Sequence, residues 1–102
     1  MSERWTRHAT DPDGRDVVFD VGSHVHLAER RPRLLDHVDA ILATIERPDH
    51  RSDDPVAGRE RFYRSEFPAP GRWLRVVVDF NDEPGWVVTA LDQENDPRLS
   101  QR

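Results

Sequence analysis

The 102-residue chain has no cysteine, no lysine and no long apolar run. Without cysteine it can form no disulfide, thiolate zinc site or cysteine nucleophile. Its longest apolar run, residues 40–43, is too short for a membrane span or for the apolar core of a signal peptide. The 20 acidic and 15 basic side chains give a net charge of −5. We therefore expect a small cytoplasmic protein that binds neither membranes nor DNA.

The length predicts a single domain, residues 1–102, with an ordered core at about residues 16–92 and polar ends. A strand is expected at 17–21, ended by Gly22, and the first fourteen residues are expected to be loose. Ser23 is expected to cap a helix that Pro32 interrupts. A second helix, ended by Pro48, is predicted by apolar residues that recur with the helical period. These are Leu34, Leu35, Val38, Ile41, Leu42 and Ile45.

Three strand-like segments follow at residues 59–66, 72–80 and 86–91. Turn-forming sequences rich in proline, glycine, asparagine and aspartate separate them, so we expect an antiparallel meander. Residues 48–58 have no periodic pattern and are expected to form an exposed loop. The predicted order is β-α-α-β-β-β. The predicted fold is α+β in two layers, with the helical pair packed on the antiparallel sheet.

The alternation of side chains along these strands predicts one apolar and one open face. In the middle strand, the alternating apolar side chains of Leu74, Val76 and Val78 are expected to face the helices. The open face is expected to gather Arg61, Tyr63, Arg75 and Thr89. Strand register is not visible in the sequence, so this convergence is an inference.

The basic side chains are unevenly distributed. Residues 59–75 contain five arginines and two glutamates, a net charge of +3, while the remaining residues carry a net charge of −8. Arg59, Arg64 and Arg72 therefore join Arg61 and Arg75 as candidate phosphate ligands. The alternative is a solvated strand face on which the arginine stems pack against the sheet.

A motif with the sequence His-Leu-Ala-Glu-Arg-Arg-Pro-Arg-Leu occupies residues 26–34. Paired aromatics at 62–63, a valine-rich strand at 74–78 and Val-Val-Thr-Ala at 87–90 follow it. This series resembles the metal-independent ribonuclease (BECR) superfamily of barnase, EndoU, colicin-type and RelE-like nucleases, and above all its small phage-associated and uncharacterised branches. The resemblance covers residues from about 17 to 91 and implies a RelE-like arrangement of helices and sheet.

The resemblance implies a small ribonuclease-like domain, a toxin or mobile-element protein, that cleaves RNA by 2′-hydroxyl attack without a metal or other cofactor. Such cleavage needs a base, an acid and cations that stabilise the phosphorane. His26 would serve as base or acid, and Arg61 and Arg75 would hold the phosphate. Tyr63 would stack a base or donate its hydroxyl. Thr89 would hydrogen-bond a phosphate oxygen.

The chain departs from the family motif, His-apolar-x-x-basic-His-Pro-Glu-apolar, at two positions. Arg31 stands where the motif has its second histidine, and Arg33 where it has glutamate. These departures favour an alternative, a catalytically inactive binding module of the same fold that engages a protein partner. The expected partners are thus RNA and an inhibitor or another protein.

Each candidate residue also has a plainer interpretation. His26 can be a helix-surface residue, Tyr63 an aromatic that covers the sheet, and Thr89 an ordinary strand residue. No metal site is expected, because His24 and His26 on one helix point about 200° apart.

Overall fold

The fold is α+β, built on a six-stranded sheet. The computed structural model describes residues 6–99. In chain order the elements are β1 (Arg7–Thr10), β2 (Asp16–Phe19), α1 (Val21–Arg30), the 3-10 helix η2 (Pro32–His37), α2 (Val38–Glu46), β3 (His50–Asp53), β4 (Arg59–Ser65), β5 (Trp73–Asp79) and β6 (Gly85–Gln93). The strand order in the sheet is β1-β2-β6-β5-β4-β3. The sheet is mixed rather than antiparallel throughout, because β2 pairs with β6 in parallel.

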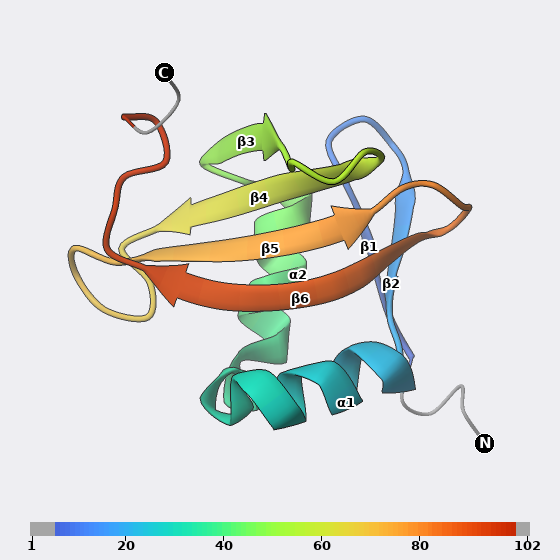
Figure 1. Cartoon of the computed structure of the whole chain (residues 1–102), viewed down its shortest axis with the longest axis horizontal. Helices are drawn as coiled ribbons and strands as arrows, with labels where there is room; N and C mark the ends of the chain where they lie inside the picture. Colours follow the sequence, from blue (N-terminus) through green and yellow to red (C-terminus); the bar gives the residue numbers. More distant parts are fainter. Residues whose placement is uncertain (1–5, 100–102) are drawn as a thin grey trace.

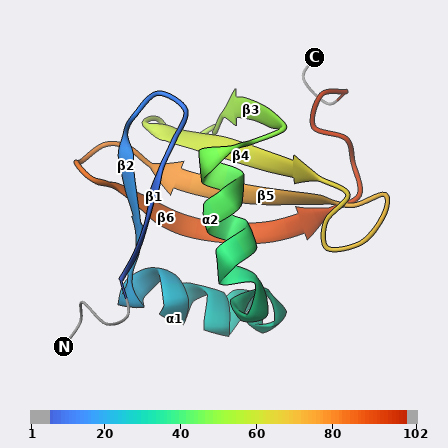
Figure 2. The ribbon, with the colours of Figure 1, turned by 180° about the vertical axis from the view of Figure 1, so that it is seen from behind.

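The helices occupy two different positions around the sheet. Figure 1 shows β4, β5 and β6 lying side by side with α2 behind them, and α1 along the β6 edge. From behind, α2 and the β1–β2 hairpin cross the back face of the sheet (Figure 2). The buried apolar core lies between these layers. It consists of Ala9, Val17, Phe19, Leu27, Leu34, Ile41, Leu42, Ile45, Phe62, Leu74, Val76, Val78, Val87 and Ala90. None of the helices in residues 6–99 has the length and apolar character needed to cross a bilayer.

The predicted meander is confirmed, and its register contains one irregularity. β4, β5 and β6 pair antiparallel in succession. Between β5 and β6 the register shifts, so that Val77 lies opposite Thr89 and Val78 opposite Val87. The extra residue, Val88, forms a β-bulge. Strict alternation of side chains along the last strand predicts that Val87 and Thr89 share one face. This prediction is wrong, because the bulge turns Val87 into the core while Thr89 stays on the other face.

The start of α1 differs from its prediction. Residue 21 belongs to the helix rather than to the preceding strand, and Asp20 is the N-cap in place of Ser23. Ser23 is the third helical residue and completes a capping box with Asp20. Its hydroxyl also donates a buried hydrogen bond of 2.7 Å to the Val87 carbonyl. This bond attaches α1 to the part of the β6 edge that the short strand β2 leaves uncovered.

Two segments expected to lack regular structure are strands. β1 lies within the first fourteen residues, ahead of the expected start of the ordered core at residue 16, and its Ala9 is buried. β3 lies within the expected loop 48–58 and pairs with β4. The second predicted helix also begins differently, because η2 precedes α2. Both strands are only four residues long and mostly polar, so the hydrophobic pattern does not mark them.

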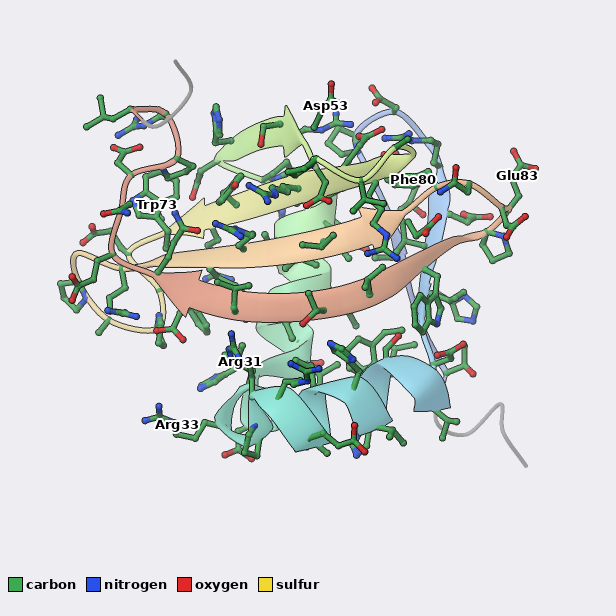
Figure 3. All side chains as sticks on the ribbon, viewed as in Figure 1. Arg31, Arg33, Asp53, Trp73, Phe80 and Glu83 are labelled. Carbon is green, nitrogen blue, oxygen red and sulfur yellow. The ribbon has the colours of Figure 1, made fainter. Side chains whose placement is uncertain are left out.

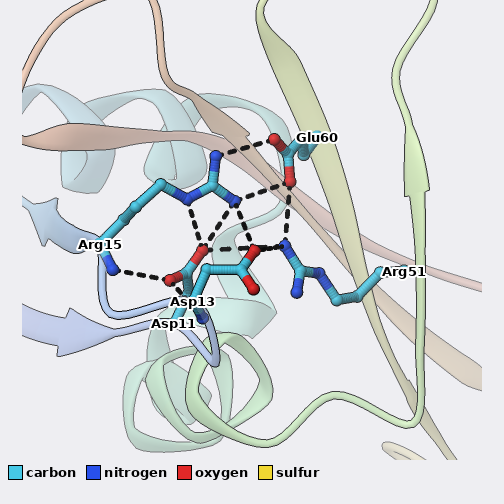
Figure 4. A network of polar contacts seen from close by, with 5 residues as sticks. All are labelled: Asp11, Asp13, Arg15, Arg51 and Glu60. Carbon is cyan, nitrogen blue, oxygen red and sulfur yellow. Dashed lines mark hydrogen bonds and ion pairs between the residues drawn. The ribbon is translucent and has the colours of Figure 1, made fainter.

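A network of five charged side chains joins the β1–β2 turn to β3 and β4 (Figure 4). The guanidinium of Arg15 donates two parallel hydrogen bonds of 2.9 Å to Glu60 and one of 2.8 Å to Asp11. Arg51 donates to Asp13 at 2.9 Å and to Glu60 at 3.2 Å. The side chain of Asp11 is fully buried. The network therefore holds the tip of the hairpin over the back face of the sheet.

The network also sets the acid sensitivity of the fold. The hydrogen bond from Arg15 lowers the pKa of Glu60 below its ordinary value of 4.5; partial burial opposes this shift and Arg51 adds to it. The stability that Glu60 contributes is thus fully present above about pH 4.5. It is lost as the pH falls through the lower pKa that the Glu60 carboxyl has in the folded chain.

We predict that Glu60→Gln reduces the loss of stability on acidification. The amide cannot take up a proton, so the free energy of unfolding of the variant falls less steeply between about pH 6 and pH 3 than that of the wild type. Urea denaturation at several pH values measures this slope. Glu83→Gln, which changes an exposed carboxylate, is the control and should leave the slope unchanged. Equal slopes for wild type and Glu60→Gln would contradict the prediction.

Candidate nucleic-acid interface

The face of β3–β6 turned away from α2 is called the open face. No element within residues 6–99 crosses its front in Figure 1. Strand register assigns its side chains. They are His50, Ser52, Arg59, Arg61, Tyr63, Trp73, Arg75, Val77, Asp79, Trp86, Thr89, Leu91 and Gln93.

The structure places four of the predicted site residues on this face. Tyr63 lies directly opposite Arg75 on the neighbouring strand. Arg61 lies opposite Val77, which in turn lies opposite Thr89. Thr89 is thus two strands away from Arg61, a separation of about 10 Å. Arg61, Tyr63 and Arg75 form a compact group, and Thr89 lies at its margin.

The predicted phosphate ligands on or near this face already have partners. Arg61 donates to Asp54 at 2.8 Å, Arg59 to Asp79 at 3.3 Å and Arg72 to Asp92 at 2.5 Å. Partial burial works to lower the pKa of Arg61, but hydrogen bonds to Asp54 and Tyr63 raise it above its ordinary value. The net charge of +3 in residues 59–75 is therefore largely offset by carboxylates from other segments.

Arg75 differs from these three arginines. Its Nη2 donates a 2.6 Å hydrogen bond to the neutral amide of Gln93, and it has no carboxylate partner among residues 6–99. Its guanidinium carbon lies 5.9 Å from the centre of the Tyr63 ring. Arg75 is therefore the predicted phosphate ligand on this face whose charge remains uncompensated.

Two predicted residues lie elsewhere. Arg64 is on the core-facing side of β4, where its guanidinium lies over the Phe67 ring at 5.1 Å. His26 lies on α1, beyond the β6 edge, and is half-buried. Within residues 6–99, no hydrogen bond or ring contact joins His26 to Arg61, Tyr63 or Arg75. The group on the open face therefore lacks the histidine that sequence reasoning assigned to it.

A different histidine, His50, takes a place in this group. β3 brings His50 opposite Tyr63 and Ser52 opposite Arg61. The His50 and Tyr63 ring centres are 5.6 Å apart. Sequence reasoning missed both residues because it assigned segment 48–58 to a loop. A faint signal was present, since His50 and Ser52 stand two positions apart, which is the spacing of one strand face.

Polar atoms without partners gather at the same place. Within residues 6–99, the buried side-chain atoms that lack a hydrogen-bond partner are His50 Nε2, Ser52 Oγ and Arg75 Nε. All three belong to the open face and surround Tyr63. Each such atom costs about 1–3 kcal/mol unless it is satisfied, so the cluster requires an explanation, such as bound water, an ion or a polar ligand.

The centre of this group is covered. Tyr63 is only 2% exposed and Trp73 only 8%. Their rings meet edge to face, with centres 6.5 Å apart. Three clefts that the described structure does contain lie elsewhere and are not lined by Tyr63. The centre of the open face is thus closely packed, and none of these three clefts opens at Tyr63.

Residues 94–99, the C-terminal segment, cover one end of this surface. Figure 3 shows Trp73 beside this segment. The Arg98 guanidinium lies 5.2 Å from the centre of the Trp73 ring, and Pro97 is buried. A hydrogen bond from Arg98 lowers the pKa of Asp96, and the nearby His50 contributes to this shift. The polar tail therefore wraps the edge of the domain and packs beside the candidate site.

Comparison with known proteins does not extend these observations. The chain matches no protein-family model, no curated protein and no solved structure. The ribonuclease resemblance and its RelE-like arrangement therefore stay predictions. Within residues 6–99, no group of three or more histidine, aspartate or glutamate side chains is placed to hold a metal ion.

We predict that deletion of residues 94–102 exposes Trp73, because Arg98 no longer lies over its ring. The measurement is broadening of the Trp73 indole NMR signal by a soluble paramagnetic agent, which should increase in the shortened chain. Trp86 is the internal control, since its indole N–H donates to Asp20 at 2.7 Å, away from the deleted segment. Unchanged broadening of Trp73 would show that the segment does not shield it.

Proposed function

We propose that this protein is an RNA-binding domain that contacts RNA through the open face of its sheet. The observation that carries the proposal is the cluster of buried polar atoms without partners, on His50, Ser52 and Arg75, around Tyr63. In a protein with a net charge of −5, Arg75 also keeps a charge that no carboxylate of residues 6–99 offsets.

The chemistry of this cluster suits a single-stranded RNA segment. The Arg75 guanidinium can donate a hydrogen bond to a phosphate oxygen, and the Ser52 hydroxyl can donate one to, or accept one from, a ribose or base. Arg75 Nε and Ser52 Oγ are buried, so covering side chains must move aside for these contacts. Unpaired bases stack on aromatic rings in many RNA-binding sheets, and the Trp73 ring, 8% exposed, lies nearer the surface than the Tyr63 ring. A base can reach Trp73 only when the C-terminal segment moves aside.

The same geometry favours binding over cleavage. Stabilisation of a phosphorane requires cations aimed at the reacting group, whereas Arg61 is held by Asp54 and Arg59 by Asp79. The expected base His26 has no described contact with the group on the open face. Catalysis is also favoured in a concave site that excludes water, and none of the three described clefts lies at Tyr63.

We predict that Arg75→Gln weakens RNA binding about tenfold, because it removes the charged donor at the centre of the face. Fluorescence anisotropy with a labelled single-stranded RNA, at constant low salt and in EDTA, measures the affinity. Arg47→Gln is the matched control, since Arg47 is exposed and lies outside the open face. Deletion of residues 94–102 should strengthen binding.

Two results would overturn the proposal. One is the absence of saturable RNA binding by both the full chain and the shortened chain at low salt. The other is an equal loss of affinity in Arg75→Gln and Arg47→Gln, which indicates a diffuse electrostatic attraction. The first result would leave a protein partner as the better alternative.

RNA cleavage is a second candidate function, favoured by one observation. His50 supplies an imidazole directly opposite Tyr63, and its Nε2 has no partner. An imidazole and a phenol hydroxyl on adjacent strands are groups that can transfer protons in 2′-hydroxyl attack.

We predict that any metal-independent cleavage depends on His50 and not on His26. In EDTA, His50→Ala and Tyr63→Phe should abolish formation of 2′,3′-cyclic phosphate ends on a structured RNA, while His26→Ala should retain it. Gel analysis of end-labelled RNA measures the products, and circular dichroism confirms that each variant is folded. Loss of cleavage in His26→Ala alone would contradict the prediction, because it would show that the catalytic histidine lies on α1 and not on the open face.

A further inference from the structure

Five arginines outside the open face have no carboxylate partner within the described part of the chain, and three of them, Arg30, Arg31 and Arg33, stand within four positions. The other two, Arg47 and Arg64, stand apart from this group in the sequence. Arg7, Arg15, Arg51, Arg59, Arg61, Arg72 and Arg98 each form an ion pair. By contrast, Arg30, Arg31 and Arg33 are exposed, and the hydrogen bond described among them runs from the Arg31 side chain to the Arg30 carbonyl. An acidic protein thus keeps three uncompensated cations within four positions.

These three side chains line a single cleft of about 250 Å³, called the arginine cleft. Its other walls come from η2, from the turn between β4 and β5, and from the end of β6. They are Pro32, Leu34, His37, Pro68 and Asp92. Figure 3 shows Arg31 between the end of α1 and β6, and Arg33 projecting outward beside it.

The acidic residue of the cleft does not neutralise these cations. Asp92 accepts two hydrogen bonds from Arg72, at 2.9 and 2.5 Å, so its charge is already offset by another arginine. Buried Leu34 and two prolines supply apolar surface in the cleft beside its charged side chains. A bound anion would therefore meet guanidinium groups in surroundings less polar than bulk water.

Local helix electrostatics explains part of this arrangement. Arg30 and Arg31 end α1, where cations are favourable for the helix dipole. Arg33 lies in the first turn of η2, where a positive charge is unfavourable. A ligand that binds all three guanidinium groups would account for an arginine at the unfavourable position 33 as well.

We propose that the arginine cleft binds a phosphate monoester group. Such a group carries a charge of about −1.5 to −2 at pH 7 and presents three strong acceptor oxygens, which match several guanidinium forks better than a carboxylate does. The group can belong to a small phosphorylated molecule or to the terminal phosphate of an RNA. This site is separate from the open face and does not depend on RNA binding there.

The test is an NMR titration of the ¹⁵N-labelled full chain, at constant ionic strength, with inorganic phosphate, adenosine 5′-monophosphate and adenosine. Phosphate and the monophosphate should shift the signals of residues 30–37 with saturation, and uncharged adenosine should not. The variant with both Arg31→Gln and Arg33→Gln should bind the monophosphate at least about tenfold more weakly. The variant with both Arg7→Gln and Arg47→Gln is the matched control, since neither side chain lines the cleft, and it should bind as the wild type does.

The absence of saturable shifts at residues 30–37, or equal weakening in the two double variants, would overturn the proposal. A second arm compares one RNA with and without a 5′-phosphate. Tighter binding of the phosphorylated RNA, lost in the Arg31/Arg33 variant, identifies RNA ends as the source of the group. Equal binding of the two RNAs, with the monophosphate still bound, identifies a small molecule. If Arg75→Gln reduces RNA binding while the cleft binds no phosphate, the cleft proposal fails and the function of the open face stands.

Discussion

The guanidinium of Arg15 is the constraint on which the rest of the structure depends. It lies 3.7 Å from the centre of the Phe80 ring and binds Glu60 and Asp11 at the same time. Through it the β1–β2 hairpin is fixed over the back face of the sheet. β2 can then pair with the start of β6, and α1 can close the remaining β6 edge through Ser23. With the back face enclosed in this way, the opposite face of the sheet stays open (Figure 1).

The distribution of arginine partners carries the functional interpretation. Counting charges along the chain makes residues 59–75 look like a basic surface, yet Asp54, Asp79 and Asp92 neutralise most of it. Among residues 6–99, the arginines without a carboxylate partner include Arg75 and the three of the arginine cleft. An arginine whose guanidinium is already paired with a carboxylate has fewer free donors for a phosphate. The partners of an arginine therefore indicate phosphate binding better than its position in a basic segment does.

Local patterns predicted much of the fold and part of the candidate site. The alternation around Tyr63 and Arg75 placed both on one face, and the stripe containing Ile41 and Ile45 predicted a buried helix. His50 could not be predicted in this group, because a four-residue polar strand acquires its structure by pairing with β4. Strand alternation also predicts the wrong face for Val87, because a bulge depends on how two strands pair and not on the sequence of one strand.

The sequence by itself determined an α+β chain with a meander at residues 59–91 and an apolar helical stripe, because helix and strand periods are properties of neighbouring residues. Only the tertiary structure decided that β2 pairs with β6 in parallel and that His50, rather than His26, lies beside Tyr63. It also decided which of the described arginines lack a carboxylate partner. Each of these depends on contacts between segments far apart in the chain, such as Arg15 with Glu60. Periodicity carries no information about such contacts.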